Sequence, residues 1–140
     1  MKASKYLLFL LIILIGSCAD NKNDIAEKRE NVNKTPVASY VIPMGDPKLD
    51  RKFGVQIFET PFTFKYLLMM FHDGTEQQDT LYIPNIGISP VIQIKPGNDT
   101  LSCVIGFLDK EKTFREYKML SATNDQLRLT TLKKYSLTTD

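Results

Sequence analysis

The segment Leu101-Ser102-Cys103-Val104-Ile105-Gly106-Phe107-Leu108 decides the fold, because it has the pattern of a buried β-strand between two turns. If the segment is extended, alternate residues from Leu101 onward, Cys103 among them, lie on one apolar face. Pro96-Gly97-Asn98-Asp99 precedes the segment and Asp109-Lys110 follows it, and such residues tolerate turn dihedrals. We therefore interpret Cys103 as a small hydrophobic residue of the core and not as a nucleophile.

The same alternation of short apolar runs and turn residues continues on both sides of this segment. Pro, Gly, Asn and Asp recur at roughly eight- to twelve-residue intervals after Pro36, which is typical of all-β sandwiches and barrels. We predict one all-β domain over residues 37–140, an immunoglobulin-like β-sandwich, with a small β-barrel as the alternative. The predicted strands are Ala38–Ile42, Gly54–Glu59, Thr63–Phe71, Thr80–Ile83, Val91–Lys95, Leu101–Leu108, Thr113–Leu120 and Gln126–Tyr135.

Two of these runs also fit a helix. The apolar residues of Thr63–Phe71 match both a period of two and a helical spacing. Thr113 and Glu116 form a formal capping box at the start of Thr113–Leu120. Both runs lie between β-type neighbours with turn-sized gaps, so we predict strands for both.

The amino-terminal residues 1–17 have the anatomy of a signal peptide. Lys2 and Lys5 form a basic start, Tyr6–Ile15 is apolar, and the small pair Gly16-Ser17 follows. As a helix the apolar run would rise only about 15 Å, half of a ~30 Å hydrocarbon core, so it is too short for a transmembrane anchor. We expect residues 1–17 to be cleaved off.

The residues Ile15-Gly16-Ser17-Cys18 resemble the lipobox of bacterial lipoproteins. The resemblance implies cleavage before Cys18, attachment of a diacylglycerol to the Cys18 thiol and acylation of the new amino group. Two or three acyl chains hold a protein on a membrane durably. Ala19 favours the outer membrane over the inner one, and Asp20-Asn21-Lys22-Asn23-Asp24 is similar to the surface-export tags of Bacteroidota lipoproteins. The chain as a whole is similar to small lipoproteins of that phylum.

Residues 18–36 are rich in Asn and charge, with Ile25 and Val32 as their only sizeable apolar side chains. Such a segment cannot bury enough surface to order itself, so we expect a lipid-anchored flexible stalk. The whole chain has 18 basic and 16 acidic residues, and residues 1–17 contain two of the lysines and no acid. The mature chain is therefore formally neutral, and we expect no nucleic-acid partner. The basic group Arg128, Lys133 and Lys134 beside Tyr135 does not change that expectation.

His72 is the only histidine, and it precedes a predicted turn at Asp73-Gly74 with Glu76 and Asp79 nearby. A metal site built from these residues is conceivable, but one imidazole with unspaced carboxylates is a weak signal. We expect a solvated hairpin tip, no metal and no other cofactor.

The triplets Asp79-Thr80-Leu81 and Asp99-Thr100-Leu101 each stand at the entrance of a predicted strand. They resemble the Asp-Thr-aliphatic acceptor of the general protein O-glycosylation system of Bacteroidota, which makes Thr80 and Thr100 candidate glycosylation sites. Turn and strand propensities alone also account for the triplets.

These features predict an outer-membrane lipoprotein of the cell envelope, facing the periplasm or the cell surface, whose domain is a non-catalytic binding or assembly module for protein or glycan. One alternative is an inhibitor of an envelope enzyme, similar to the small β lipoproteins that inhibit lysozyme, although the cysteine pair of that group is missing here. The other alternative is a metal-dependent enzyme that uses the His72 region.

Overall fold

The computed structural model describes residues 27–135, and the regular structure in that range is entirely β. Each of the eight predicted runs overlaps one observed strand, and both runs that also fit a helix are strands. The strands are β1 (Ala38–Pro43), β2 (Lys52–Glu59), β3 (Lys65–His72), β4 (Thr75–Tyr82), β5 (Ile92–Pro96), β6 (Ser102–Leu108), β7 (Phe114–Thr123) and β8 (Gln126–Thr131).

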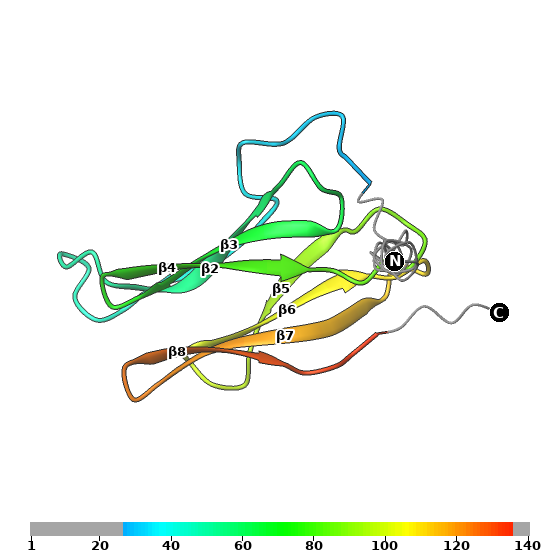
Figure 1. Ribbon diagram of the computed structural model, residues 1–140. Coiled ribbons are helices and arrows are strands. Elements are labelled where there is room, and N and C mark those ends of the chain that lie inside the picture. The colour runs from blue at the N-terminus through cyan, green and yellow to red at the C-terminus, as the bar shows by residue number, and fades with distance from the viewer. Residues whose placement is uncertain (1–26, 136–140) are drawn as a thin grey trace, which may run out of the picture.

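The strands form two antiparallel four-stranded sheets, in the orders β1-β2-β3-β4 and β5-β6-β7-β8. Figure 1 shows them as two layers whose strands run along the same long axis. The predicted β-sandwich is confirmed, and the strands do not close into a barrel. Each sheet consists of consecutive strands, whereas immunoglobulin domains exchange strands between sheets through Greek-key connections. The likeness to that fold therefore lies in the two packed sheets and not in the strand order.

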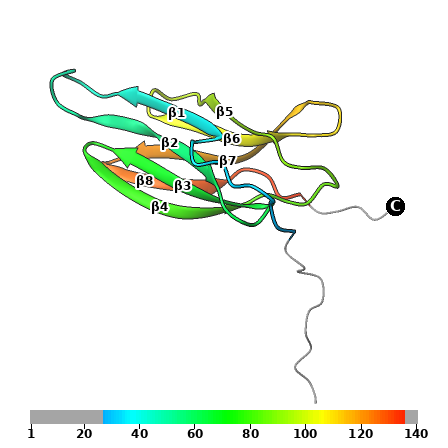
Figure 2. The same ribbon diagram turned by 90° about the horizontal axis from the view of Figure 1, so that it is seen from above.

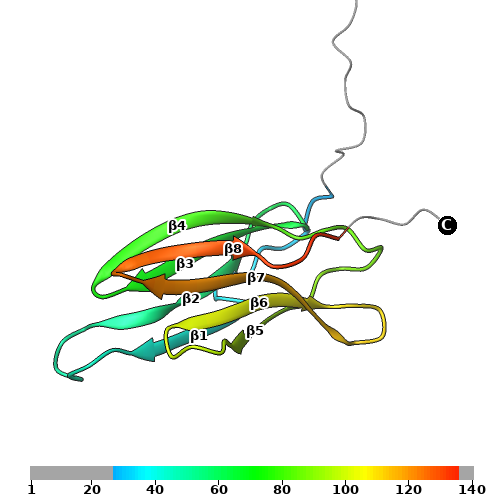
Figure 3. The ribbon, with the colours of Figure 1, turned by 90° about the horizontal axis from the view of Figure 1, so that it is seen from below.

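The two sheets meet most closely along one edge, where β1 contacts β5. The opposite edge is β4 in the first sheet and β8 in the second. The views from above and below show these two strands overlying each other (Figures 2 and 3). The turns between β3 and β4 and between β7 and β8 lie at one end of the sandwich. The chain enters β1 at the opposite end (Figure 2).

The core lies between the sheets and is built from alternate residues of the central strands. Phe53, Val55 and Ile57 of β2 are fully buried, as are Cys103 and Ile105 of β6. The predicted core position of Cys103 is thus confirmed. Burying side chains of this size contributes about 1.5–3 kcal/mol each, which makes the core the main source of stability.

Tight turns fix the register of two hairpins. Asp73 and Gly74 between β3 and β4 have φ of 48° and 78°, and Asn124 and Asp125 between β7 and β8 have φ of 49° and 60°. Two consecutive residues with positive φ are the pattern of a type I′ turn, whose twist matches that of the flanking strands. Asp, Asn and Gly are the residues that adopt this conformation at least cost.

Strand β4 begins at Thr75, well before the predicted start at Thr80. Its first half is polar and exposed, because it is an edge strand that little of the other sheet covers. Gln77 and Asp79 pair with the core-facing residues Met70 and Leu68, so their side chains lie on the core side of the sheet and are nevertheless exposed. The strand therefore lacks the alternation by which strands are recognised.

Candidate functional site

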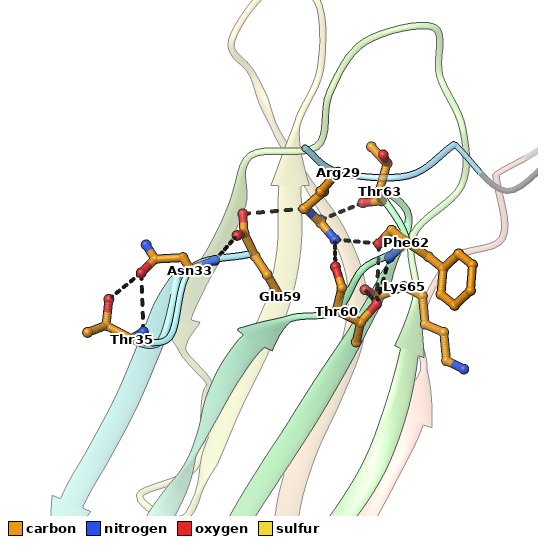
Figure 4. Close-up of polar contacts among 8 residues, drawn as sticks. All are labelled: Arg29, Asn33, Thr35, Glu59, Thr60, Phe62, Thr63 and Lys65. Carbon is orange, nitrogen blue, oxygen red and sulfur yellow. Dashed lines mark hydrogen bonds and ion pairs between the residues drawn. The ribbon is translucent and has the colours of Figure 1, made fainter. Parts of the chain in front are cut away.

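A single arginine attaches the chain before β1 to the end of the first sheet. The Arg29 guanidinium donates hydrogen bonds to the carbonyl oxygens of Thr60 at 2.7 Å and Thr63 at 2.6 Å, and to that of Phe62 (Figure 4). These three carbonyls belong to the connection between β2 and β3. The Arg29 side chain is only 11% exposed, and within residues 27–135 it is the only donor to the carbonyl oxygens of Thr60 and Thr63. The Phe62 oxygen also accepts from the Lys65 N–H.

Further contacts complete this attachment, which we call the Arg29 clamp. Arg29 lies 3.5 Å from a Glu59 carboxylate oxygen, and the other oxygen of Glu59 accepts a 2.7 Å hydrogen bond from the backbone N–H of Asn33. The guanidinium carbon lies 4.6 Å from the centre of the Tyr66 ring, within range of a cation–π interaction. Burial raises the pKa of the Tyr66 phenol, and the positive charge of Arg29 only partly offsets that effect.

The backbone takes part in the clamp as well. The Arg29 N–H donates to the carbonyl of Pro61 at 2.9 Å, and the Thr63 N–H donates to the carbonyl of Glu27 at 2.8 Å. The pairing of Lys28 with Phe62 is an isolated antiparallel bridge. We expected residues 18–36 to form a flexible stalk, but within that segment the structure attaches Glu27, Arg29 and Asn33 to the sandwich. Residues 18–26 lie outside the described range.

An open cleft of about 370 Å³ lies beside the clamp. Glu27, Arg29, Glu59, Tyr66 and Pro90 contribute to its lining. Arg29 and Glu59 are engaged with each other and with the backbone, so the charged groups at the base of this cleft have a structural role.

A second cleft, of about 330 Å³, lies at the same end of the molecule. Its lining comes from the connection between β4 and β5, the end of β6, the turn between β6 and β7, the start of β7 and the chain after β8. It comprises Ile86, Phe107, Asp109, Lys110, Glu111, Arg115 and Tyr135. We call it the Tyr135 cleft.

Three packed aromatic rings lie at the Tyr135 cleft. The Phe107 ring packs edge to face with those of Tyr117 and Tyr135, at centroid distances of 6.1 and 5.1 Å. The Tyr135 hydroxyl donates a 2.6 Å hydrogen bond to the carbonyl of Glu116, which holds the ring in place. Burial raises the pKa of the Tyr117 phenol.

Asp109 organises the turn at the rim of this cleft. One carboxylate oxygen accepts hydrogen bonds from the backbone N–H groups of Glu111 and Thr113 at 3.0 and 2.8 Å. The other oxygen accepts from Arg115 at 2.6 Å. Desolvation acts to raise the pKa of Asp109, but these hydrogen bonds and the Arg115 charge outweigh it and bring the pKa below its usual value.

Of the modification sites predicted from the sequence, the structure describes Thr80 and Thr100. Cys18 lies outside the described residues. Thr80 is half-buried within β4, and its N–H donates to the Asp79 carboxylate at 2.7 Å. Thr100 is exposed in the turn between β5 and β6. The two candidate glycosylation sites therefore differ in accessibility.

The expectation that His72 lies at a solvated hairpin tip is wrong. His72 is the last residue of β3, shares the core-facing side with Met70 and is only 5% exposed. Glu76 pairs with Phe71 and so lies on the opposite face, while Asp79 lies four positions along β4 from the partner of His72, roughly 13 Å away at ~3.3 Å per residue. Residues 27–135 contain no group of three His, Cys, Asp or Glu side chains placed to hold a metal ion.

Sequence reasoning missed the two residues that organise these sites. Arg29 lies in a charged segment with no local pattern, and its partners are more than thirty residues away in the sequence. Tyr135 was read as part of a basic group, in which Lys133 in fact lies 3.6 Å from Glu116. The only sequence signal for a role of Tyr135 in a site was that it is an aromatic residue following the β7–β8 hairpin.

Comparisons with known proteins found no match to this chain among family models, curated proteins or solved structures. Within residues 27–135 the structure has no helix of the length and apolar character needed to cross a membrane.

Proposed function

We propose that this protein is a lipoprotein of the cell envelope, held on the outer membrane by lipid on Cys18, and that its β-sandwich is a non-catalytic module that binds or assembles protein or glycan. The lipobox-like sequence before Cys18 supports the anchor. The Arg29 clamp supports a defined orientation of the anchored domain, because it attaches the segment before β1 to one end of the sandwich.

The clamp gives the anchored domain a preferred orientation. Residues 19–26 alone separate the lipid-bearing residue from the first described residue, Glu27. The end that carries the clamp then faces the bilayer. The turns at the opposite end, including residues 44–51 and 97–101, then lie farther from the bilayer.

Replacement of Cys18 tests the anchor. We expect Cys18→Ser to abolish labelling with radioactive palmitate and to move the protein from the membrane fraction to the soluble fraction. Cys103→Ala is the matched control, because it removes the other cysteine and should leave both readouts unchanged. Equal fractionation and labelling of wild type and Cys18→Ser would refute the anchor.

Labelling with a bulky maleimide polymer tests the orientation on lipid vesicles. The buried Cys103 should not react, so a cysteine introduced at exposed Lys48 or Glu111 reports on its own end of the domain. We expect Lys48→Cys to react faster than Glu111→Cys on vesicles and both to react equally in detergent. Equal rates on vesicles would contradict the proposed orientation.

A further inference from the structure

The Tyr135 cleft combines an apolar floor with a polar rim. Ile86 and Tyr135 are half-buried residues that pack against the core, and their remaining exposed surface lines the cleft. The cleft volume of about 330 Å³ lies at the lower end of the range for small-ligand pockets, which suits one ring-sized ligand unit.

The rim carries balanced charge. Asp109 and Arg115 form an ion pair at 2.6 Å, which uses both of these groups. Lys110 and Glu111 are exposed and form no ion pair with any residue in the described part of the chain. Glu111 would repel an anionic ligand and Lys110 would repel a cationic one. The rim therefore favours neither class of charged ligand.

Lys110 also bridges the two walls of the cleft. Its amino group lies 3.6 Å from the position that a Cβ atom would take at Gly87, in the connection between β4 and β5. The ammonium group can donate hydrogen bonds into the cleft, and the Glu111 carboxylate can accept them. A ligand with hydroxyl groups can use both residues at once, because a hydroxyl both donates and accepts.

We propose that the Tyr135 cleft binds a neutral pyranose ring of a glycan. The C–H groups on one face of such a ring are apolar and pack on the exposed part of the Tyr135 ring, while its hydroxyl groups reach Lys110 and Glu111. The Tyr135 hydroxyl is already bonded to the Glu116 carbonyl, so the aromatic ring and not the hydroxyl provides the contact. This inference deepens the proposed function, since it selects glycan over protein as the ligand of this site.

Saturation-transfer NMR of the full lipidated protein in detergent, where both ends of the domain are accessible, tests the proposal. The probes are the methyl glycosides of glucose, galactose, mannose and N-acetylglucosamine. We expect at least one of them to bind saturably, with the strongest transfer to protons on one ring face. Glucitol carries similar hydroxyl groups without a ring face, and it should give no saturable signal.

Matched variants assign the binding to the cleft. Tyr135→Ala should weaken binding about tenfold or more, since it removes the ring. Tyr135→Phe keeps the ring and should bind like wild type. Tyr82→Ala removes a tyrosine that is 61% exposed on the other sheet and should also leave binding unchanged. Lys110→Ala, at an exposed rim position, should weaken binding without affecting the fold.

The inference is overturned if no glycoside binds, if glucitol binds equally well, or if Tyr135→Ala and Lys110→Ala both bind like wild type. Binding that appears only after removal of residues 136–140 would also overturn it, because those residues would then be the occupant. If no glycoside binds but the wild-type protein is still labelled with palmitate, this inference alone is refuted. Loss of labelling with glycoside binding retained refutes only the anchor.

Discussion

At the scale of single residues, two charged side chains that are each only 11% exposed, Arg29 and Asp109, act on the backbone. Arg29 donates to three carbonyl oxygens, and Asp109 accepts from two backbone N–H groups. In both cases the charged side chain forms hydrogen bonds with backbone groups of a loop, because no neighbouring strand pairs with those groups. Loss of either side chain would leave two backbone groups without their partner in the protein.

Replacing Arg29 should destabilise the protein strongly. Arg29→Ala leaves the Thr60 and Thr63 carbonyls without a donor and removes the positive charge beside Glu59, and we expect a loss of about 2–4 kcal/mol in the free energy of unfolding. Chemical denaturation measures this loss. Arg128→Ala, at an exposed position in β8, is the control and should change stability by less than about 0.5 kcal/mol. Equal midpoints for both variants would refute the clamp.

The Cys103 thiol should make stability depend on alkaline pH. Burial raises its pKa from 9.0 to about 12, so between these values the unfolded chain releases a proton that the folded protein retains. The free energy of unfolding should therefore fall as pH rises from 9 toward 12, by up to about 1.4 kcal/mol per pH unit from this group.

Urea denaturation at several alkaline pH values measures this dependence. Tyr66 and Tyr117, whose pKa values are also raised, act in the same direction at higher pH. Cys103→Ala should therefore show a shallower decline than wild type, beginning at a higher pH. Parallel profiles for the two proteins would show that the thiol is not the source.

At the scale of the elements, turn residues made the fold predictable. The Asp73-Gly74 pair marked the turn between β3 and β4, and the alternation in Leu101–Leu108 marked a strand with a buried face. The polar start of β4 carries no such signal, because its strand conformation depends on pairing with β3. The same holds for residues 27–36, which are ordered by partners distant in the sequence.

The sheet edge formed by β1 depends on a glycine in β2. Gly54 has φ of 153°, and an added Cβ atom would collide with the Tyr40 carbonyl oxygen and lie 2.7 Å from the Val41 Cα atom. We expect Gly54→Ala to cost about 2–4 kcal/mol, because β1 must move away from β2. Thermal and urea denaturation measure the loss.

Gly74 is the matched control for this substitution. It also has positive φ, at 78°, but no atom lies within 4 Å of an added Cβ. Gly74→Ala should cost only the backbone strain, about 1 kcal/mol. If the two variants were equally stable, close approach of β1 would not be the reason for glycine at position 54.

At the scale of the whole molecule, the two sheets share one core. Residues from both sheets, such as Leu68 and Leu120, belong to a single buried cluster. Neither sheet can keep its apolar face covered without the other. The sequence was sufficient to predict this sandwich, but it could not predict which loops form the clefts, since Ile86, Lys110 and Tyr135 come together only when the sheets pack.

The shared core predicts one cooperative unfolding transition. Circular dichroism and tyrosine fluorescence should give coincident urea curves, and amide exchange in β3 and β6 should report the same global free energy. Separate transitions for the two sheets would contradict a common core. Leu120 lies in the second sheet, but the cavity that Leu120→Ala leaves lies in the core of both sheets. The substitution should therefore lower the free energy of unfolding reported by amide exchange in both β3 and β6.

The exposed carboxylate of Asp79 on the core side of edge strand β4 has a consequence for self-assembly. A bare edge strand offers its free backbone groups to a neighbouring copy, which could extend the sheet from one molecule to the next. Such an extension would enclose the Asp79 charge between stacked sheets without a counter-ion. Copies concentrated together should therefore stay separate instead of polymerising into fibrils.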